Sequence, residues 1–136
     1  MSIHQKIKPD IGQIKFLCEA GQVLASKGLY VEACDVFQGV VALAPERAIG
    51  YTFLGDAYLE QGKFDEALKT HQKAVEVEPS NTFAQVHLGE AFLFKKQREK
   101  ALSVLRKVVD SDPRGADGAL ARQLIKGAEQ GLFAKL

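Results

Sequence analysis

Tryptophan is absent from this sequence, methionine occurs once, and cysteine occurs only twice, at Cys18 and Cys34. Two cysteines are too few for a disulfide framework or a cysteine-based metal cluster, so we expect reduced thiols. No apolar run approaches the roughly 20 residues that a membrane-spanning helix needs. Residues 1–13 also lack the apolar stretch of a secretory signal peptide. The sequence therefore predicts a cytoplasmic protein with no membrane span.

An excess of charge of one sign is missing as well. The 18 basic and 17 acidic residues nearly cancel, leaving a formal net charge of +1. A nearly neutral chain gives no electrostatic basis for binding nucleic acid or an anionic membrane surface. Of its 136 residues, 46% are hydrophobic and 26% are charged, which is typical of a globular domain rather than a disordered chain. We expect one domain-sized core and no nucleic-acid partner.

Motifs that carry catalytic or cofactor chemistry are also absent. The sequence holds no glycine-rich nucleotide loop, no GxSxG and no HExxH. Its three histidines, His4, His71 and His87, are isolated in sequence, and we expect His71 to be a core residue with a hydrogen-bond partner. His87 and Glu90 lie close together in sequence, but no nucleophile or second carboxylate completes a catalytic set with them. We therefore predict no enzyme activity, no cofactor and no metal site.

What the sequence does contain is a repeat. Prolines, alanines and glycines each recur at one constant interval, without an insertion or a deletion. An interval of this length, about 34 residues, indicates one supersecondary unit that is copied along the chain. We call it the repeat interval. The repeated positions are Pro45, Pro79 and Pro113; Ala33, Ala67 and Ala101; and Gly21, Gly55 and Gly89.

Each unit has the pattern of two helices joined by a short turn. Apolar residues follow a helical spacing in the segment 51–58 and again from Phe64 onward. Gly28 and Gly62 stand where a residue with positive φ ends a helix, whereas the third unit has Lys96 at this position. A glycine within a helix costs about 1 kcal/mol relative to alanine. We therefore expect the repeated mid-helix glycines to permit close approach of two helices.

The repeat resembles the tetratricopeptide repeat (TPR). In that family the first helix carries large–x2–Leu–Gly–x2–Tyr, and the second carries alanines before a closing proline. The unit 48–81 matches this pattern best, at Tyr51, Leu54, Gly55, Tyr58, Gly62, Phe64, Ala67, Ala74 and Pro79. The third unit departs from the pattern at its turn, at Lys96 and Arg98. The resemblance implies an all-α fold, a right-handed superhelical stack of three helix-turn-helix hairpins.

The resemblance also divides the chain into three parts. Residues 14–115 hold the three repeats, at 14–47, 48–81 and 82–115. Residues 116–136 form a C-terminal capping helix, because stacked hairpins otherwise expose an apolar end. Residues 1–13 form an N-terminal arm or short cap. The apolar face of the capping helix is expected at Leu120, Leu124, Ala128 and Leu132, and the N-terminal segment carries Ile3, Ile7 and Ile11 at helical spacing.

In the TPR family the first helices of the repeats line a concave groove that binds partners. Some members hold a terminal carboxylate there with a clamp of Lys, Asn, Asn, Lys and Arg side chains. Cys18, Gln22, Phe53, Phe83 and His87 stand at those positions here, so the resemblance implies no binding of a chaperone C-terminal tail. The groove residues implied by the resemblance are Lys15, Cys18, Gln22, Ile49, Thr52, Phe53, Asp56, Phe83, Val86, His87, Glu90 and Phe94.

This groove is apolar with an acidic edge. Soluble monomers usually avoid exposing a large apolar area. We therefore expect the groove to bind a partner protein or peptide that has apolar anchors, and a basic residue of that partner to lie near Asp56 or Glu90. A structural alternative is that some of the phenylalanines pack between hairpins or under the C-terminal helix. The apolar side chains concerned are Phe53, Phe83, Val86 and Phe94.

The leading hypothesis is a non-catalytic interaction module. One alternative is a chaperone, because three repeats with a short N-terminal arm and no clamp are similar to type III secretion chaperones for translocator proteins. Another is a self-assembling scaffold, since unit 48–81 has six acidic and three basic residues whereas unit 82–115 has seven basic and four acidic. The chaperone alternative implies a homodimer through the N-terminal segment, and the scaffold alternative implies self-assembly through the ends of the stack.

Overall fold

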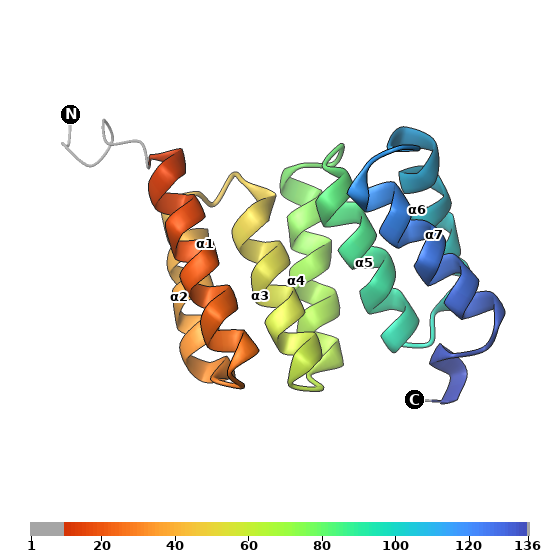
Figure 1. Cartoon of the computed structure of the whole chain (residues 1–136), viewed down its shortest axis with the longest axis horizontal. Helices are drawn as coiled ribbons and strands as arrows, with labels where there is room; N and C mark the ends of the chain where they lie inside the picture. The colour runs from red at the N-terminus through yellow and green to blue at the C-terminus, as the bar shows by residue number, and fades with distance from the viewer. Residues whose placement is uncertain (1–9, 136) are drawn as a thin grey trace.

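The computed structural model describes residues 10–135, which form seven α-helices and one short 3-10 helix (Figure 1). No strand occurs within the described residues. The all-α fold predicted from the sequence is confirmed. The helices are α1 (Ile11–Ser26), α2 (Tyr30–Leu43), α3 (Ala48–Glu60), α4 (Phe64–Val77), α5 (Thr82–Phe94), α6 (Arg98–Ser111) and α7 (Ala116–Glu129), and the 3-10 helix is η2 (Phe133–Lys135).

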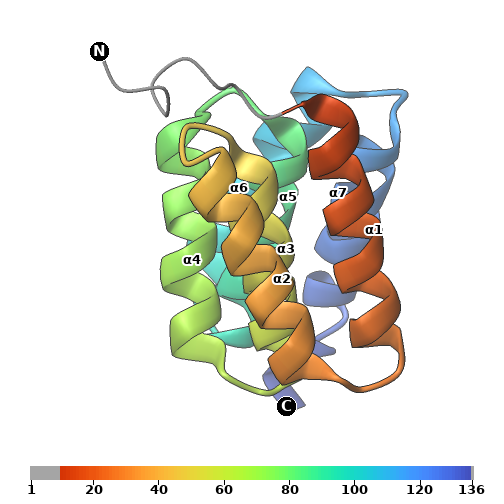
Figure 2. The same ribbon diagram turned by 90° about the vertical axis from the view of Figure 1, so that its left-hand side faces the viewer.

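The helices form hairpins that stack side by side along the long axis of the molecule (Figure 1). Viewed along the stack, α1, α3, α5 and α7 form one layer and α2, α4 and α6 form the other (Figure 2). α7 packs against α5 and α6, and it starts one repeat interval after α5, where the first helix of a further unit would start. Three hairpins and a capping helix, as expected, make up the fold.

The mid-helix glycines mark the places where the two helices of each hairpin meet most closely. A Cβ atom added to Gly55 would lie 2.5 Å from Nε2 of His71, which shows that the ring packs directly onto the α3 backbone. Gly21 receives Phe37 and Gly89 receives Leu105 in the same way. The expected close approach is confirmed. The three receiving residues, Phe37, His71 and Leu105, are themselves one repeat interval apart.

The turns within the hairpins share one backbone conformation. Gly28 and Gly62 have φ values of 77° and 76°, as their position at the helix ends predicts. Lys96 adopts φ 59° at the equivalent place, although a side chain disfavours this left-handed region. The third turn therefore keeps the same shape while its sequence differs.

The two ends of the stack differ from the sequence-based expectations. α1 begins at Ile11, with Asp10 accepting a hydrogen bond from the N–H of Gly12 at 3.0 Å as its N-cap. Residues 1–9, which include Ile3 and Ile7, lie outside the described residues. The expectation for Leu132 was wrong: α7 ends at Glu129, so Leu132 lies beyond the helix and is 57% exposed. No helix within residues 10–135 is long and apolar enough to cross a bilayer.

Candidate functional site

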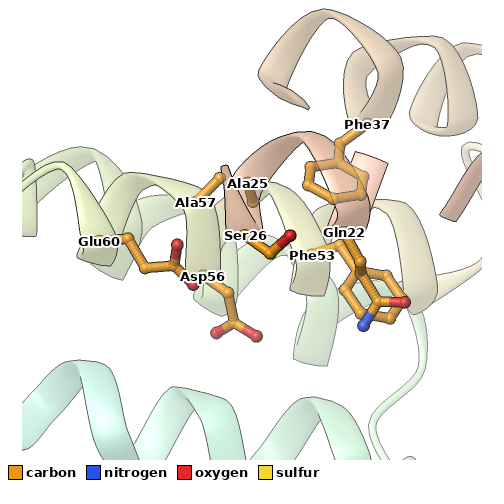
Figure 3. A pocket seen from close by; sticks show the side chains of 8 residues that line it. All are labelled: Gln22, Ala25, Ser26, Phe37, Phe53, Asp56, Ala57 and Glu60. Carbon is orange, nitrogen blue, oxygen red and sulfur yellow. The ribbon is translucent and has the colours of Figure 1, made fainter. Parts of the chain in front are cut away.

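Two hollows lie in the layer of first helices and meet at α3. The first has a volume of about 210 Å³ and lies between α1 and α3 (Figure 3). The second has a volume of about 270 Å³ and lies between α3 and α5. Asp56 and Glu60 line both hollows, so the two form one depression, called the groove below. The groove is lined by Gln22, Ala25, Ser26, Phe37, Phe53, Asp56, Ala57, Leu59, Glu60, Glu90 and Phe94.

A row of aromatic rings crosses three helices beside the groove. The ring centroids of Phe37 and Phe53 are 5.5 Å apart, those of Phe53 and Phe83 are 5.6 Å apart, and those of Phe83 and His87 are 4.8 Å apart. These distances are typical of favourable aromatic pairs. The row joins α2, α3 and α5 and gives the groove a rigid apolar wall.

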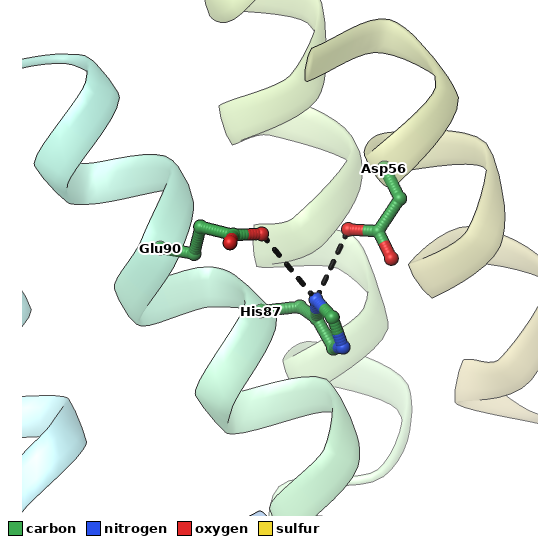
Figure 4. Close-up of side chains that lie close together, drawn as sticks. All are labelled: Asp56, His87 and Glu90. Carbon is green, nitrogen blue, oxygen red and sulfur yellow. Dashed lines mark ion pairs between the residues drawn. The ribbon is translucent and has the colours of Figure 1, made fainter. Parts of the chain in front are cut away.

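Next to this wall, three helices bring two histidines and two carboxylates together. Asp56 Oδ1 lies 3.1 Å from Nδ1 of His87 and 3.3 Å from Nε2 of His71. Glu90 Oε1 lies 3.6 Å from the same His87 nitrogen, so Asp56 and Glu90 approach it from two sides (Figure 4). The rings are not aligned for hydrogen bonding to Oδ1, so these are close nitrogen–oxygen contacts without hydrogen-bond geometry. We call Asp56, His71, His87 and Glu90 the histidine–carboxylate cluster.

The charges in this cluster depend on one another. Burial opposes a positive charge on His87, but its contacts with Asp56 and Glu90 outweigh burial and raise the pKa of His87 to about 10. Burial also opposes the negative charge of Asp56, yet its contacts with His71 and His87 hold the pKa of that carboxyl below its usual range. The carboxylates of Asp56 and Glu90 therefore stabilise a positive charge on the His87 ring.

Glu60 belongs to the groove and was missed by the sequence analysis. Burial, together with the negative charges of Asp56 and Glu90, raises the pKa of its carboxyl. Glu60 lies one helical turn after Asp56 on α3, and that spacing was the available signal. Its inclusion makes the acidic edge larger than predicted.

Two family models match the chain. One, described as a TPR repeat, covers residues 55–96, and the other, described as a tetratricopeptide repeat, covers residues 83–114. Together the two models match residues 55–114 of this chain to the tetratricopeptide repeat. The matches fall on the second and third hairpins, and the first hairpin, α1 and α2, follows the same repeat interval.

Solved structures of TPR proteins share the fold. The first TPR of Spaghetti (RPAP3), bound to the HSP90 peptide SRMEEVD, has a TM-score of 0.78 at 24% identity, with 91% of this chain and 98% of that chain covered. The TPR2B domain of yeast Sti1, in its pHsp70 complex, gives 0.76 at 24% identity, covering 86% and 96%. The Yersinia enterocolitica type III secretion translocator chaperone SycD gives 0.74 at 16% identity, covering 89% and 95%. A search of curated proteins found no match.

The structure places the predicted site residues in three environments. Lys15 and Gln22 are exposed on α1. Seven are half-buried, of which Phe53, Asp56, Glu90 and Phe94 line the groove. The half-buried residues are Ile49, Phe53, Asp56, Phe83, His87, Glu90 and Phe94, and the remaining three are buried.

The buried three correct the predicted groove. Cys18 is 3% exposed, and Thr52 and Val86 are 0% exposed, so none of them reaches a partner. Thr52 Oγ1 donates a hydrogen bond to the carbonyl oxygen of Ala48 at 2.9 Å, within its own helix. Cys18 and the second cysteine, Cys34, are free thiols, and burial raises the pKa of both. Thr52 and Val86 lie on α3 and α5, which have helices on several sides, and Cys18 packs with Val40 and Ala44 at the end of α2.

Phe94 is shared between the groove and the C-terminal cap. Its ring stacks on Phe64 of α4 at 5.3 Å and meets Phe133 of η2 edge-on at 5.5 Å. The sequence left open whether a groove phenylalanine packs under the C-terminal segment. Phe94 does so through its contact with Phe133, and it also lines the groove. Apart from Leu132, the exposed large apolar side chains of the described residues lie on the first hairpin, at Ile11, Phe16, Val23, Leu29, Val31 and Leu43.

Proposed function

We propose that this TPR protein is a non-catalytic interaction module of the cytoplasm, and that its groove binds a peptide or helical segment of a partner protein. The observation that carries the proposal is the groove itself. Half-buried phenylalanines, Phe53 and Phe94, lie beside the carboxylates of Asp56, Glu60 and Glu90. An apolar anchor of the partner would cover the rings, and a basic side chain next to it would meet the carboxylates.

The fold relatives support peptide binding in general and point to a different peptide here. One relative is bound to the HSP90 peptide SRMEEVD, which is rich in acidic residues. In this chain the groove presents three carboxylates, and Gln22 and Phe53 stand at two of the clamp positions. Like charges that face each other across an interface disfavour binding. The ligand class we propose is therefore an apolar and basic segment, not an acidic tail.

Selection from a random peptide library displayed on phage tests this proposal. The protein is immobilised in the presence of a chelator, and the selected peptides are synthesised and titrated by fluorescence polarisation. We expect a consensus with two large apolar residues next to Lys or Arg. Gln22→Trp would fill the hollow between α1 and α3, because Gln22 is exposed and lines it. That change should weaken binding at least tenfold, which is about 1.4 kcal/mol.

Gln72→Trp is the matched control, since Gln72 is exposed on α4 and lines neither hollow. It should leave the dissociation constant unchanged. Equal losses for the two variants would place the peptide outside the groove. A consensus without apolar anchors would overturn the proposed ligand class.

A second candidate role is self-association, as in a dimeric chaperone or a scaffold. The exposed apolar side chains of α1, Ile11, Phe16 and Val23, favour it, because soluble monomers seldom display such a row. One fold relative, SycD, is described as a translocator chaperone in an alternative dimer. Sedimentation velocity at two salt concentrations tests this candidate: Phe16→Glu should convert dimers to monomers, and a wild-type monomer at all concentrations would rule it out.

A further inference from the structure

The histidine–carboxylate cluster holds more coordinating capacity than its own contacts use. Asp56 Oδ1, His87 Nδ1 and both ring nitrogens of His71 are buried, and none has an aligned hydrogen-bond partner among residues 10–135. His71 is 0% exposed, and its Nε2 lies 3.3 Å from Asp56 Oδ1. Buried polar atoms in proteins nearly always have a partner. Carboxylate oxygens and an imidazole nitrogen that meet at one buried point favour a cation there.

The spacing of Asp56, His87 and Glu90 matches a transition-metal site. One ligand atom from each of Asp56, His87 and Glu90 can be chosen so that all lie within 4.8 Å of one another. His87 Nδ1 is 3.1 Å from Asp56 Oδ1 and 3.6 Å from Glu90 Oε1. Zinc binds nitrogen and oxygen at roughly 2.0–2.2 Å, so two ligands of a tetrahedral ion lie about 3.4 Å apart. A small inward movement of Glu90 would complete this geometry.

We propose that Asp56, His87 and Glu90 bind a zinc ion between α3 and α5. Asp56 comes from the second repeat, whereas His87 and Glu90 come from the third, so the ion links two repeats. Because Asp56 and Glu90 line the hollow between α3 and α5, the ion reaches the site from the groove, and its fourth coordination position faces that hollow. His71 acts as a positioning residue that orients the Asp56 carboxylate from behind.

The donor set distinguishes zinc from the common hard cations. Calcium and magnesium require six or more ligands, nearly all of them oxygen, whereas imidazole and carboxylate together suit zinc and its neighbours in the periodic table. With neutral His87, the two carboxylates balance the charge of a divalent ion. The zinc site shares Asp56 and Glu90 with the proposed peptide groove, and the chelator in the peptide selection keeps the two tests separate.

Titration of the chelator-treated full chain with zinc, and separately with cobalt, tests the proposal. Isothermal titration calorimetry should show one zinc ion per chain, and cobalt should give the intense visible absorption of a tetrahedral site. Zinc at a hundred times its dissociation constant should also raise the unfolding midpoint temperature measurably.

Glu90→Gln keeps the shape of the side chain and removes the charge of one ligand. It should weaken zinc binding tenfold or more, which is about the loss seen when residues of a metal site are changed. Glu60→Gln is the matched control, because Glu60 lines the same hollow but is not in the ligand set; it should change the affinity less than threefold. Circular dichroism checks that both variants fold. In the wild-type chain, cobalt should broaden the NMR signals around His87, which requires no variant.

Three outcomes would overturn the proposal. The first is the absence of saturable binding of one ion per chain. The second is an equal loss of affinity in Glu90→Gln and Glu60→Gln, which would indicate a diffuse electrostatic effect. The third is evidence for other ligands. A thiolate-to-cobalt charge-transfer band would assign the ion to Cys18 or Cys34, and a loss of binding in His4→Gln would assign it to His4.

Discussion

Glu78, the residue after α4, caps the start of α3 in the same repeat. Its Oε1 accepts a hydrogen bond from the backbone N–H of Ala48 at 2.7 Å. The guanidinium of Arg47 lies 3.3 Å from the same oxygen, and the side chain of Asn81 donates to Oε2 at 3.3 Å. One carboxylate thus ties the first turn of α3 to the loop between α4 and α5. It fixes the start of α3 against the end of α4, the two helices of the second hairpin.

This cap predicts a loss of stability in acid. The hydrogen bond from Ala48, helped by Asn81 and Arg47, holds the pKa of Glu78 below its ordinary value in the folded state despite partial burial. A lowered folded-state pKa adds stability above the unfolded pKa, about 4.3, and this stability is lost as pH falls through the folded-state pKa. Glu78→Gln should therefore flatten the stability curve between about pH 5 and pH 3, measured by urea unfolding.

Truncation of the same residue gives a second measurement. Glu78→Ala should lower the free energy of unfolding at pH 7 by about 1 kcal/mol, as the loss of a helix N-cap does. Glu76→Ala is the control, because the Glu76 side chain is 71% exposed and its ion pair is with Lys73 in the same helix. Equal effects of the two changes would mean that the contact with Ala48 contributes nothing.

Close packing at Gly55 predicts that alanine there destabilises the fold. An added Cβ would lie 2.5 Å from the buried ring of His71. Overpacking of this kind costs about 1–3 kcal/mol, against a gain of about 1 kcal/mol in helix propensity. We expect Gly55→Ala to lower the free energy of unfolding by up to about 2 kcal/mol on balance.

Gly39 provides the matched control, because it lies in α2 and a Cβ there would meet nothing within 4 Å. Gly39→Ala should raise the free energy of unfolding by about 1 kcal/mol. Thermal and urea unfolding measure the change in the free energy of unfolding of each variant, which should be negative for Gly55→Ala and positive for Gly39→Ala. A stabilising Gly55→Ala would contradict the close approach of α3 and α4.

The turn at Lys96 predicts that glycine stabilises the third hairpin. Lys96 adopts φ 59°, a region that costs a residue with a side chain about 1–2 kcal/mol. Lys96→Gly should raise the free energy of unfolding by about 1 kcal/mol, and the reverse change, Gly62→Lys, should lower it by a similar amount. Because a Cβ at Gly62 would meet nothing within 4 Å, that change tests the backbone alone. The prediction requires that the two variants change the free energy of unfolding in opposite directions.

The acidic groove predicts that the HSP90 peptide SRMEEVD does not bind this chain. Asp56, Glu60 and Glu90 line the groove, and their negative charge repels an acidic tail. Fluorescence polarisation with the labelled peptide should show no saturable binding at physiological salt. A peptide from the phage selection is the positive control. Micromolar binding of SRMEEVD would show that the charge argument fails.

The helices and their stacking followed from the sequence because they depend on local pattern. Glycines and prolines at the constant repeat interval indicated where each helix starts, turns and ends, and the mid-helix glycines correctly indicated close packing. The groove was harder to predict. Cys18, Thr52 and Val86 were placed in it by family resemblance, yet they are buried, because small differences in the rotation of a helix decide whether a position at the edge of its inner face contacts solvent or a neighbour.

The sequence by itself determined the repeat, the all-α stack and the residues that let its helices approach, since each of these depends on residues within one unit. Only the tertiary structure decided which side chains from different units meet. Asp56, His71 and His87 come from three successive helices, α3, α4 and α5, and lie several helical turns apart in the sequence, so no local pattern links them. Their meeting depends on how far one hairpin rotates against the next, which packing across the whole stack sets.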